Sequence, residues 1–379
     1  INATRQNNWT LIIPENPSGI TAPNPRRGQS MVYDESRHLS ILFGGYSYKP
    51  VKIEYNDTWI LNLTANKWVK INTVNAPSPR SMAGLAYDKI NDKIILYGGV
   101  EETSGGKCLN DTYVYNIKNN TWIDMNSVIS PQAVLGPSMA YDKSTGVCVL
   151  FGGFLSPDVS NETWIYNLTT NTWTNMSPAN APPKRILPAF AYDEGLKQIL
   201  LFGGEDSSTS TPLQDTWAYN ISSNTWTNLY PFRSPDPRYS SIMTYNNKDS
   251  KTFLYGGIYT STFNDTWEYN SILNTWEQIE AVNSPSQRWS CGITYDNYYN
   301  SIILFGGEFL NKSGNYWLGD TWAWNDSSRN TPGKYLSAPQ DTRGSANFGH
   351  LSWNASIPAN TAVKVQFRSA NDLPTMLNS

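Results

Sequence analysis

The chain has 379 residues, which is long for one small core and short for three ordinary domains. Its net charge of −3 and its pI near 5.5 argue against a nucleic-acid-binding protein. It contains no run of 18 or more apolar residues, so the sequence predicts no membrane-spanning helix. Charged residues make up only 16% of the chain while aromatic residues reach 13%. That much ring area must be buried in a core or exposed on a binding surface.

Three cysteines, Cys108, Cys148 and Cys291, are too few for a disulfide framework, and their number is odd. Cys148 lies in the apolar run VCVLFGG and is expected to be a buried thiol. The sequence leaves open whether two of the three form a disulfide. The chain begins at Ile1 without a Met, which fits a removed signal peptide or a trimmed chain.

Six Gly-Gly pairs follow apolar runs, and their first glycines lie 54, 54, 51, 53 and 50 residues apart. A Tyr precedes each pair by eleven residues, and a DTW triplet or a near copy follows it. In five repeats a second Trp stands nine residues after the aromatic residue of the triplet. A period near 50 is typical of a blade of four short antiparallel strands, here named a to d in chain order.

This pattern resembles the kelch motif over about residues 7 to 326. The resemblance implies a six-bladed β-propeller of the galactose-oxidase-like kind, as in secreted archaeal and bacterial surface proteins. The residues favour the same fold independently, because segments such as SMAGLAYD and KIILYGG are short and rich in β-branched and aromatic residues. We therefore predict an all-β, six-bladed propeller over residues 1–332.

The sixth repeat contains strands a to c only, because Thr331 stands where the Trp of strand d is expected. The segment NNWT near the N-terminus contains the missing residue, Trp9. We predict that residues 7–13 form strand d of blade 6, pair with strand c near Trp322 and close the ring. The alternative is a five-bladed ring followed by a damaged sixth repeat.

Residues 333–379 do not continue the repeat. The segments GHLSWNAS and AVKVQFRSA alternate like strands, and the region resembles the start of a β-sandwich module. The region is shorter than a complete sandwich of about 100 residues. We therefore expect an incomplete module: either the native chain continues, or another subunit completes the fold. In the second case its open edges would pair with other copies of the chain, or with a subunit of a filament or surface layer.

Four repeated features have structural interpretations. The Tyr-Asp pair ending strand a suits a tight turn, because Asp can bond to the backbone of the turn. The Gly-Gly pair predicts backbone conformations or close approaches that a Cβ would prevent. The regularly spaced Trp residues are expected to pack between blades. The acid of the DTW triplet is expected to cap a turn rather than to bind a metal ion.

Length variation between repeats falls almost entirely in the b–c connection, where the first glycine and the triplet acid are separated by 13, 13, 10, 12, 9 and 14 residues. In an up-and-down blade the b–c and d–a connections leave the same face, which we call the loop face. Variable loops on a rigid scaffold indicate a recognition surface. Its aromatic residues suit stacking on sugars or docking on a protein, unless they fold back over neighbouring blades. They include Tyr46, Tyr48, Tyr55, Phe154, Tyr259, Phe263, Phe309, Tyr316 and Trp317.

An arginine stands seven residues before the repeated Tyr in every blade except the third, which has Val134. Such a ring of guanidinium groups could hold a carboxylate, a sulfate or an acidic sugar near the central opening. The structural alternative is that each arginine ties blades together through carbonyl groups or an Asp. The five residues are Arg26, Arg80, Arg185, Arg238 and Arg288.

Enzyme chemistry has little support in the sequence, so we predict a non-enzymatic protein without a cofactor or metal ion. Only two histidines occur: His38 in a predicted a–b turn, and His350 beyond the propeller. The copper site of galactose-oxidase relatives requires two His ligands and Tyr ligands. The alternative is a carbohydrate-active enzyme, of a sialic-acid type, that uses the arginine-rich opening.

Fourteen Asn-x-Ser/Thr sequons indicate a secreted or cell-surface glycoprotein. We therefore predict an extracellular adhesion or assembly module whose loop face binds a glycan or a surface protein, and no nucleic-acid partner. The sequons begin at Asn2, Asn8, Asn56, Asn62, Asn110, Asn119, Asn161, Asn167, Asn175, Asn220, Asn264, Asn311, Asn325 and Asn354.

Overall fold

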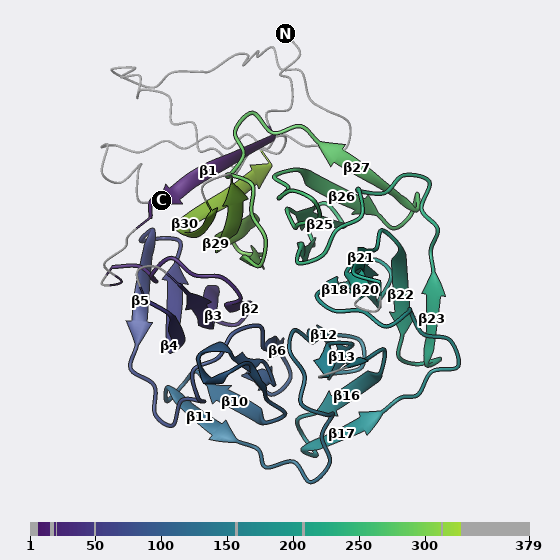
Figure 1. The fold of residues 1–379 in the computed structure, drawn as a ribbon, viewed down its shortest axis with the longest axis horizontal. Coiled ribbons are helices and arrows are strands. Elements are labelled where there is room, and N and C mark those ends of the chain that lie inside the picture. Colours follow the sequence, from purple (N-terminus) through teal and green to yellow (C-terminus); the bar gives the residue numbers. More distant parts are fainter. Residues whose placement is uncertain are drawn as a thin grey trace, which may run out of the picture. The chain divides into compact units, whose positions relative to one another are not determined.

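The computed structural model describes residues 7–15, 19, 21–48, 51–155, 158–206, 209–311 and 314–326. They form a ring of six four-stranded antiparallel sheets, one for each repeat (Figure 1). The prediction of an all-β, six-bladed propeller is therefore confirmed. The predicted sandwich-like module at 333–379 lies outside the described residues.

Within each blade, strand a lies nearest the axis and strand d lies at the rim (Figure 1). Blade 1 contains β2 (Ser30–Asp34), β3 (Leu39–Ser47), β4 (Ile53–Asn62) and β5 (Lys67–Ile71). Blade 2 contains β6 (Gly84–Asp88), β7 (Lys93–Tyr97), β10 (Thr112–Asn116) and β11 (Thr121–Asp124). Blade 3 contains β12 (Ser138–Asp142), β13 (Val147–Phe151), β16 (Thr163–Asn167) and β17 (Thr172–Asn175).

The other three blades repeat this order. Blade 4 contains β18 (Ala189–Asp193), β19 (Gln198–Phe202), β22 (Thr216–Asn220) and β23 (Thr225–Asn228). Blade 5 contains β24 (Ile242–Asn246), β25 (Lys251–Tyr255), β26 (Thr266–Asn270) and β27 (Thr275–Ile279). Blade 6 contains β28 (Gly292–Asp296), β29 (Ser301–Asn311), β30 (Gly314–Asp326) and, as its strand d, β1 (Asn7–Ile13).

The ring is closed by β1, which pairs antiparallel with β30 (Figure 1). In this register Trp9 lies opposite Trp324, and Leu11 lies opposite Trp322. Trp9 is fully buried, and its Nε1 donates a hydrogen bond to Thr266 Oγ1 at 3.2 Å. The predicted closure is confirmed, and the five-bladed alternative is wrong.

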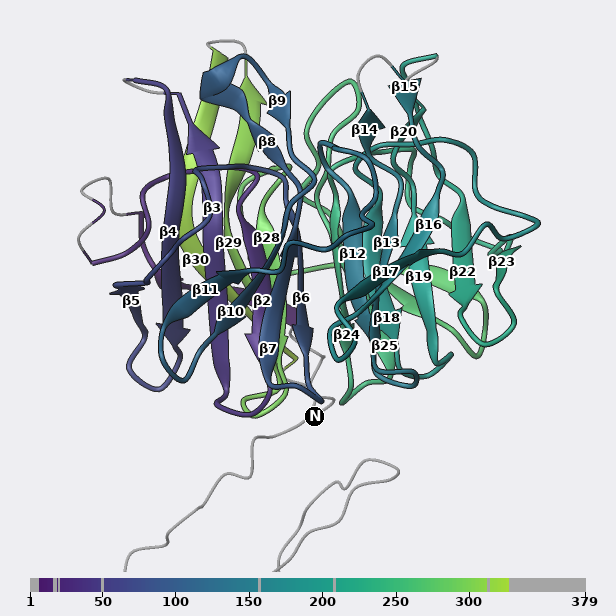
Figure 2. The same ribbon diagram turned by 90° about the horizontal axis from the view of Figure 1, so that it is seen from below.

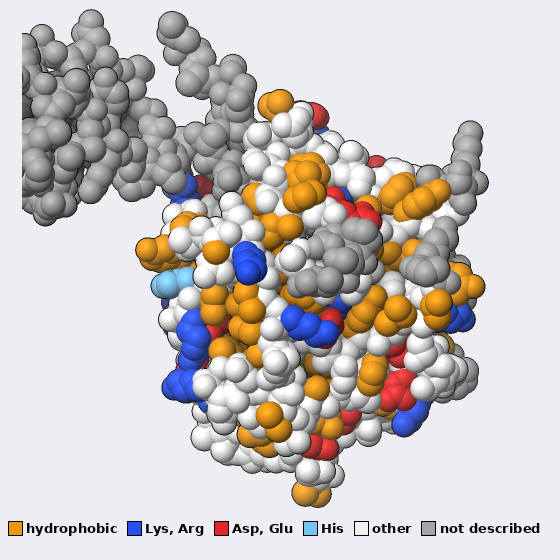
Figure 3. Space-filling view, turned by 90° about the vertical axis from the view of Figure 1, so that its left-hand side faces the viewer, with side chains coloured by type: hydrophobic (Ala, Val, Ile, Leu, Met, Phe, Trp, Pro, Cys, Tyr) orange, Lys and Arg blue, Asp and Glu red, His pale blue; other side chains and the backbone are white. Residues whose placement is uncertain are grey.

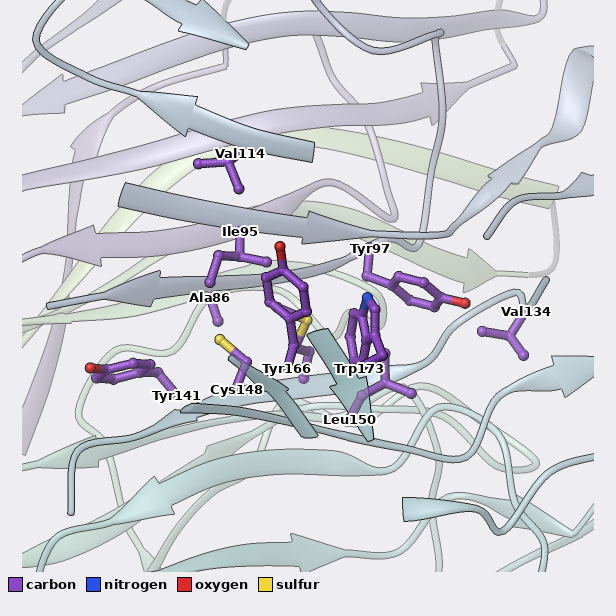
Figure 4. Close-up of a cluster of buried hydrophobic side chains, with 11 residues drawn as sticks. Ala86, Ile95, Tyr97, Val114, Val134, Tyr141, Cys148, Leu150, Tyr166 and Trp173 are labelled. Carbon is purple, nitrogen blue, oxygen red and sulfur yellow. The ribbon is translucent and has the colours of Figure 1, made fainter. Parts of the chain in front are cut away.

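The core lies between neighbouring blades, and the strand-d tryptophans pack into it. Each of these indoles donates a hydrogen bond to the Thr of the DTW-like triplet in the preceding blade, as from Trp173 Nε1 to Thr112 Oγ1 at 2.9 Å. Figure 4 shows Trp173 between Tyr97 and Tyr166, with Cys148 in the same cluster. All three cysteines are free, and Cys148 is buried as predicted. The prediction that the tryptophans pack between blades is confirmed.

The turn and glycine predictions are also confirmed. Asp34 Oδ1 accepts a hydrogen bond from the backbone N of Ser36 at 2.8 Å, within the a–b turn. Gly44 has a φ of +69°, and a Cβ there would lie 2.6 Å from the carbonyl oxygen of Arg80 in the next blade. The following Gly45 donates its backbone N–H to that same oxygen at 2.9 Å. The Gly-Gly pair is thus a joint between blades, where any side chain would prevent the approach.

The b–c connections stand together at one edge of the propeller (Figure 2). In blades 1 and 6 they are β-hairpins that continue β3 into β4 and β29 into β30. His38 lies in an a–b turn at the opposite edge, the turn face. The remaining loop-face elements are β8 (Val100–Glu101), the 3-10 turn η1 (Glu102–Ser104), β9 (Lys107–Cys108), β14 (Phe154–Leu155), β15 (Asp158–Val159), β20 (Glu205–Asp206) and β21 (Thr211–Pro212).

The side of the propeller formed by blade 1 and its neighbours has a mixed surface. Apolar side chains form several separate patches there, with basic and acidic side chains between them (Figure 3). Within the described ranges, no helix has the length and apolar character needed to cross a membrane.

Candidate functional site

The five repeated arginines are almost fully buried, with exposed fractions of 0 to 1%. Each guanidinium forms an ion pair with the triplet Asp of its own blade. In blade 4, Arg185 Nη1 lies 2.6 Å from Asp215 Oδ1, and Nη2 lies 2.8 Å from Oδ2. Its Nε and Nη1 also donate to the backbone oxygens of Pro183 and Gly203. The five pairs are Arg26–Asp57, Arg80–Asp111, Arg185–Asp215, Arg238–Asp265 and Arg288–Asp320.

These contacts contradict the hypothesis that the five arginines bind a ligand. Their donors are already used within the blade, so the structural alternative holds: they tie strand a to the Gly-Gly joint and to strand c. The predicted turn-capping role of the triplet acid is also wrong. Asp215 accepts hydrogen bonds from Arg185 and from the indole of Trp217, the latter at 2.7 Å. In blade 1, burial tends to raise the pKa of Asp57, but the charge and hydrogen bonds of Arg26, together with the hydrogen bond from Trp59, outweigh this effect and the pKa is lowered.

The candidate loop aromatics divide into buried and exposed residues. Tyr46 is only 6% exposed and packs against the guanidinium of Arg27. The prediction that it stacks on a ligand is therefore wrong. Tyr48 is 49% exposed, and its ring centroid lies 6.0 Å from that of Trp317 on the neighbouring hairpin. Phe309 stacks on Tyr316 at 5.2 Å. Of the predicted aromatic residues, the structure therefore brings together those of the blade 1 and blade 6 hairpins.

Exposed apolar side chains are found on the loops of three adjacent blades, 5, 6 and 1. Six of them have exposed fractions between 38 and 63%. We call them the apolar arc. The blade 5 loop joins the blade 6 hairpin through a hydrogen bond from Leu310 N to Thr262 Oγ1 at 3.4 Å. The apolar arc consists of Tyr48, Val51, Ile53, Tyr259, Leu310 and Tyr316.

A second group of residues frames the loop-face end of the central channel. In every blade, the residue after the repeated arginine position forms a β-bridge with the residue after the Gly-Gly pair. We call these twelve residues the mouth. They are Arg27 with Tyr46, Ser81 with Val100, Leu135 with Phe154, Ile186 with Glu205, Tyr239 with Ile258, and Trp289 with Glu308.

Arg27 links three blades at the mouth. Its Nη2 lies 3.2 Å from Glu102 Oε2 of blade 2, and its Nε lies 3.2 Å from Glu308 Oε2 of blade 6. The guanidinium carbon lies 5.0 Å from the centre of the Trp289 ring. Burial raises the pKa of Glu308, although the charge of Arg27 acts in the opposite direction.

The channel below the mouth contains two cavities. The cavity nearer the loop face has a volume of about 220 Å³ and is lined by the beginnings of the six strands a. The cavity nearer the turn face has a volume of about 200 Å³ and is lined by the six repeated tyrosines, among other residues. Lys143 forms ion pairs with Glu35 and Glu194 among the lining residues of this second cavity, which places opposite charges of blades 1, 3 and 4 in contact.

The family model described as the KLHDC2/KLHL20/DRC7 kelch-repeats domain matches residues 2–186, 42–231 and 143–331. The chain belongs to the kelch-repeat family. Among its relatives, Kelch domain-containing protein 10 of Xenopus tropicalis is 27% identical over 225 residues, which cover 56% of this chain and 53% of the relative. The Homo sapiens protein of that name is 26% identical over 222 residues, covering 55% and 49%.

This kelch chain thus spans about half the length of the curated relatives it matches. These relatives are vertebrate proteins, so they do not support the expected archaeal or bacterial surface-protein type. Over the described stretches of the kelch propeller, no three His, Cys, Asp or Glu side chains are grouped as metal ligands.

Sequence reasoning missed the mouth of the kelch propeller. The arginines drew attention because they repeat, but the residues that form the mouth bridges, next to those lining the cavity nearer the loop face, come one position later. At that position the six blades carry Arg27, Ser81, Leu135, Ile186, Tyr239 and Trp289. A position that changes in every blade beside one that hardly changes is the signal that could have identified the mouth, because variable positions on a repeated scaffold often form the binding face.

Proposed function

We propose that this kelch propeller is a non-catalytic module that binds a segment of a partner protein through its loop face, over blades 5, 6 and 1. The observation that carries the proposal is the apolar arc, whose side chains are 38 to 63% exposed on three adjacent blades. Exposed apolar side chains gathered on one face, with polar groups beside them, are characteristic of protein-interaction sites. The mouth supplies the polar groups.

A protein segment fits this surface better than the acidic sugar considered from the sequence. The arginines that would have recognised such a sugar are buried in ion pairs, as in Arg80–Asp111. The same burial removes the support for a carbohydrate-active enzyme with an arginine-rich opening. The apolar arc includes the aliphatic side chains Val51, Ile53 and Leu310, which contribute to protein interfaces by apolar burial rather than by ring stacking.

Selection from a phage-displayed library of random peptides tests the proposal. Selected peptides, made synthetically, should bind the wild type and lose at least about tenfold in affinity when Tyr48 and Leu310 are both replaced by Ala. The matched control replaces Ile90 and Ile272 by Ser, because these side chains are 71% and 91% exposed in turns of the opposite face. The control should bind the peptides like the wild type.

Two results would contradict the proposal. One is a selection that enriches no peptide on the folded wild-type protein. The other is a set of peptides whose binding is lost in the Ile90 and Ile272 variant and kept in the Tyr48 and Leu310 variant, since this would place the binding surface on the turn face.

We also propose that the protein is glycosylated and extracellular, which the sequons support. Among them, Asn62, Asn110 and Asn119 are exposed, so a glycan could be accommodated at each. Peptide mass spectrometry of protein secreted from a glycosylating eukaryotic host would test this. Modified peptides at these three positions are expected, and unmodified peptides throughout would overturn the proposal.

A further inference from the structure

We propose that the bound partner segment inserts a basic side chain, Lys or Arg, into the mouth of the channel, between Glu205 of blade 4 and Glu308 of blade 6. This inference rests on the proposed function and adds the charge of the partner. It joins two surfaces: the apolar arc would hold apolar side chains of the segment, and the mouth would hold the basic one.

The first argument is charge. Glu205 and Glu308 occupy the same position of the repeat, directly after the Gly-Gly pair, and Glu102 lies beside the mouth next to Arg27. Glu102 and Glu308 both pair with the Arg27 guanidinium, whereas Glu205 does not, so these four side chains together carry a net charge of −2. A basic segment is attracted to such a site, whereas an acidic one is repelled.

The second argument is that these carboxylates are poorly compensated. Among the described residues, no hydrogen bond or ion pair holds the Glu205 carboxylate, and its partial burial raises its pKa. Glu308 is only 1% exposed; it is hydrogen-bonded to Asn315 and paired with Arg27 Nε, but its Oε2 has no aligned hydrogen bond. A partly buried carboxylate without a full set of partners is costly, and an incoming cation would reduce that cost.

The third argument is independent of the carboxylates and concerns the cavity below the mouth. Three buried polar atoms that line it have no hydrogen-bond partner in the protein: Gln29 Oε1, Ser240 Oγ and Ser241 Oγ. These residues are only 5 to 6% exposed. All three atoms can accept hydrogen bonds, and no charged side chain lines this cavity. A basic side chain brings only donors, so the cavity matches its end group in hydrogen-bond polarity.

The fourth argument is the shape of the opening. The residues one position below the mouth have positive φ angles, as at Met82 (52°) and Ser240 (53°). Neighbouring blades are joined there by backbone hydrogen bonds, from Met82 N to Gly28 O at 2.7 Å and from Ser240 N to Leu187 O at 2.9 Å. The opening is thus framed by bonded backbone, which suits one long, thin side chain better than a folded loop.

Aromatic rings complete the site. Tyr239 and Trp289 belong to the mouth. Tyr239 lies near Glu205: burial raises the pKa of the Tyr239 hydroxyl, and the charge of Glu205 raises it further. Arg27 already lies 5.0 Å from the Trp289 ring, which demonstrates that this mouth can hold a cation against an aromatic face.

The test repeats the peptide selection on the wild type and on a double variant, Glu205→Gln with Glu308→Gln. Peptides enriched on the wild type should carry one Lys or Arg close to aromatic or aliphatic residues. On the double variant the apolar residues should remain enriched and the basic residue should not. Glu277→Gln is the matched control, because Glu277 is exposed on strand d at the rim, and it should select the same peptides as the wild type.

Affinities of one selected peptide complete the experiment. Replacing its basic residue by norleucine should weaken binding to the wild type at least about tenfold and leave binding to the double variant unchanged. Peptides that bind through the apolar arc but show no preference for a basic residue would overturn this inference and leave the proposed function standing. A selection without any enriched peptide would overturn both. Circular dichroism and thermal melting of the variants separate loss of binding from loss of the fold.

Discussion

Blades 3 and 6 both depart from the repeat, and they compensate in different ways. Blade 3 has Val134 in place of the repeated arginine, and its triplet acid is Glu162. Val134 is 3% exposed within the core shared with blade 2. Glu162 is exposed, and its Oε2 accepts a hydrogen bond from Trp164 Nε1 at 2.8 Å. Here both members of the buried ion pair have changed together, so no buried charge is left alone.

Blade 6 keeps its ion pair, Arg288 with Asp320, but takes its strand d from the other end of the propeller. The borrowed strand reproduces the contacts of the others: Trp9 donates to Thr266 just as Trp226 donates to Thr163. Blade 3 therefore compensates locally by side-chain chemistry, whereas blade 6 depends on a pairing between residues about 300 positions apart. The comparison teaches that the ion pair can be exchanged within a blade, while among the described residues the missing strand is supplied from the other end of the propeller sequence.

The largest expected effect follows from removing the borrowed strand. Deleting residues 1–13 would expose the edge of β30 and open the core of Trp9, Tyr255 and Trp324. We expect the deleted protein to aggregate or to melt well below the full chain. Trp9→Ala alone should cost about 3–5 kcal/mol, as should Trp226→Ala in a blade with its own strand d. Thermal and urea unfolding measure these changes.

The control for the borrowed strand lies two residues away. Leu11 belongs to the same strand but is 45% exposed, so Leu11→Ala should change stability by no more than about 0.5 kcal/mol. If the deletion melted like the full chain, the ring would not depend on β1. If Trp9→Ala were much milder than Trp226→Ala, the borrowed strand would not be equivalent to the others.

A smaller effect is expected when blade 4 is changed toward blade 3. Arg185→Val leaves Asp215 with a partly buried charge and no guanidinium, and should cost about 3 kcal/mol, the lower end for breaking a buried ion pair, because Asp215 is 24% exposed. The double variant Arg185→Val with Asp215→Glu reproduces the residues of blade 3 and should recover part of this loss. Urea unfolding of the single and double variants measures how much of the lost stability the second substitution restores. A double variant less stable than the single one would contradict local compensation.

Much of the fold could be predicted from the sequence because its constraints repeat. The Gly-Gly joint needs a positive φ at Gly44 and leaves no room for a Cβ, so the same residues must recur in every blade. The indole of Trp9 fits only one position in a blade. A single NNWT segment ahead of the first repeat therefore identified the closing strand. The repeated residues therefore identify the positions that hold the blades together, because the steric requirements are strictest there.

The candidate site could be predicted only in part, because function lies in the residues that do not repeat. Arg26 and Arg27 are adjacent, yet the first is fully buried in its blade and the second reaches Glu308 in the mouth and Glu102 beside it. Spacing alone does not distinguish these two environments. The prediction for the exposed Tyr48 required only that it lie on a long loop, whereas the link through Arg27 depends on side chains from three blades meeting in space.

The smallest expected effect is on the pH dependence of stability. In blade 6, burial tends to raise the pKa of Asp320, but the hydrogen bonds and charge of Arg288 outweigh it, so the pKa is lowered. A carboxyl group whose pKa is lowered by folding stabilises the protein above its unfolded pKa, about 3.9, and this contribution is lost as the pH falls through the native pKa. The double variant Arg288→Met with Asp320→Asn should therefore lose less stability than the wild type on acidification below about pH 4.

Urea unfolding at a series of pH values measures this difference between the variant and the wild type. Glu162→Gln is the matched control, because in blade 3 no arginine of the repeated series faces the acid and Glu162 is exposed. It should follow the wild-type pH dependence, while the blade 6 variant departs from it only on the acidic side. Parallel curves for the wild type and the blade 6 variant would mean that the ion pair contributes equally at all pH values. The acid stability of the ring would then depend on other carboxyl groups, and the absence of the repeated arginine from blade 3 would not change stability at acidic pH.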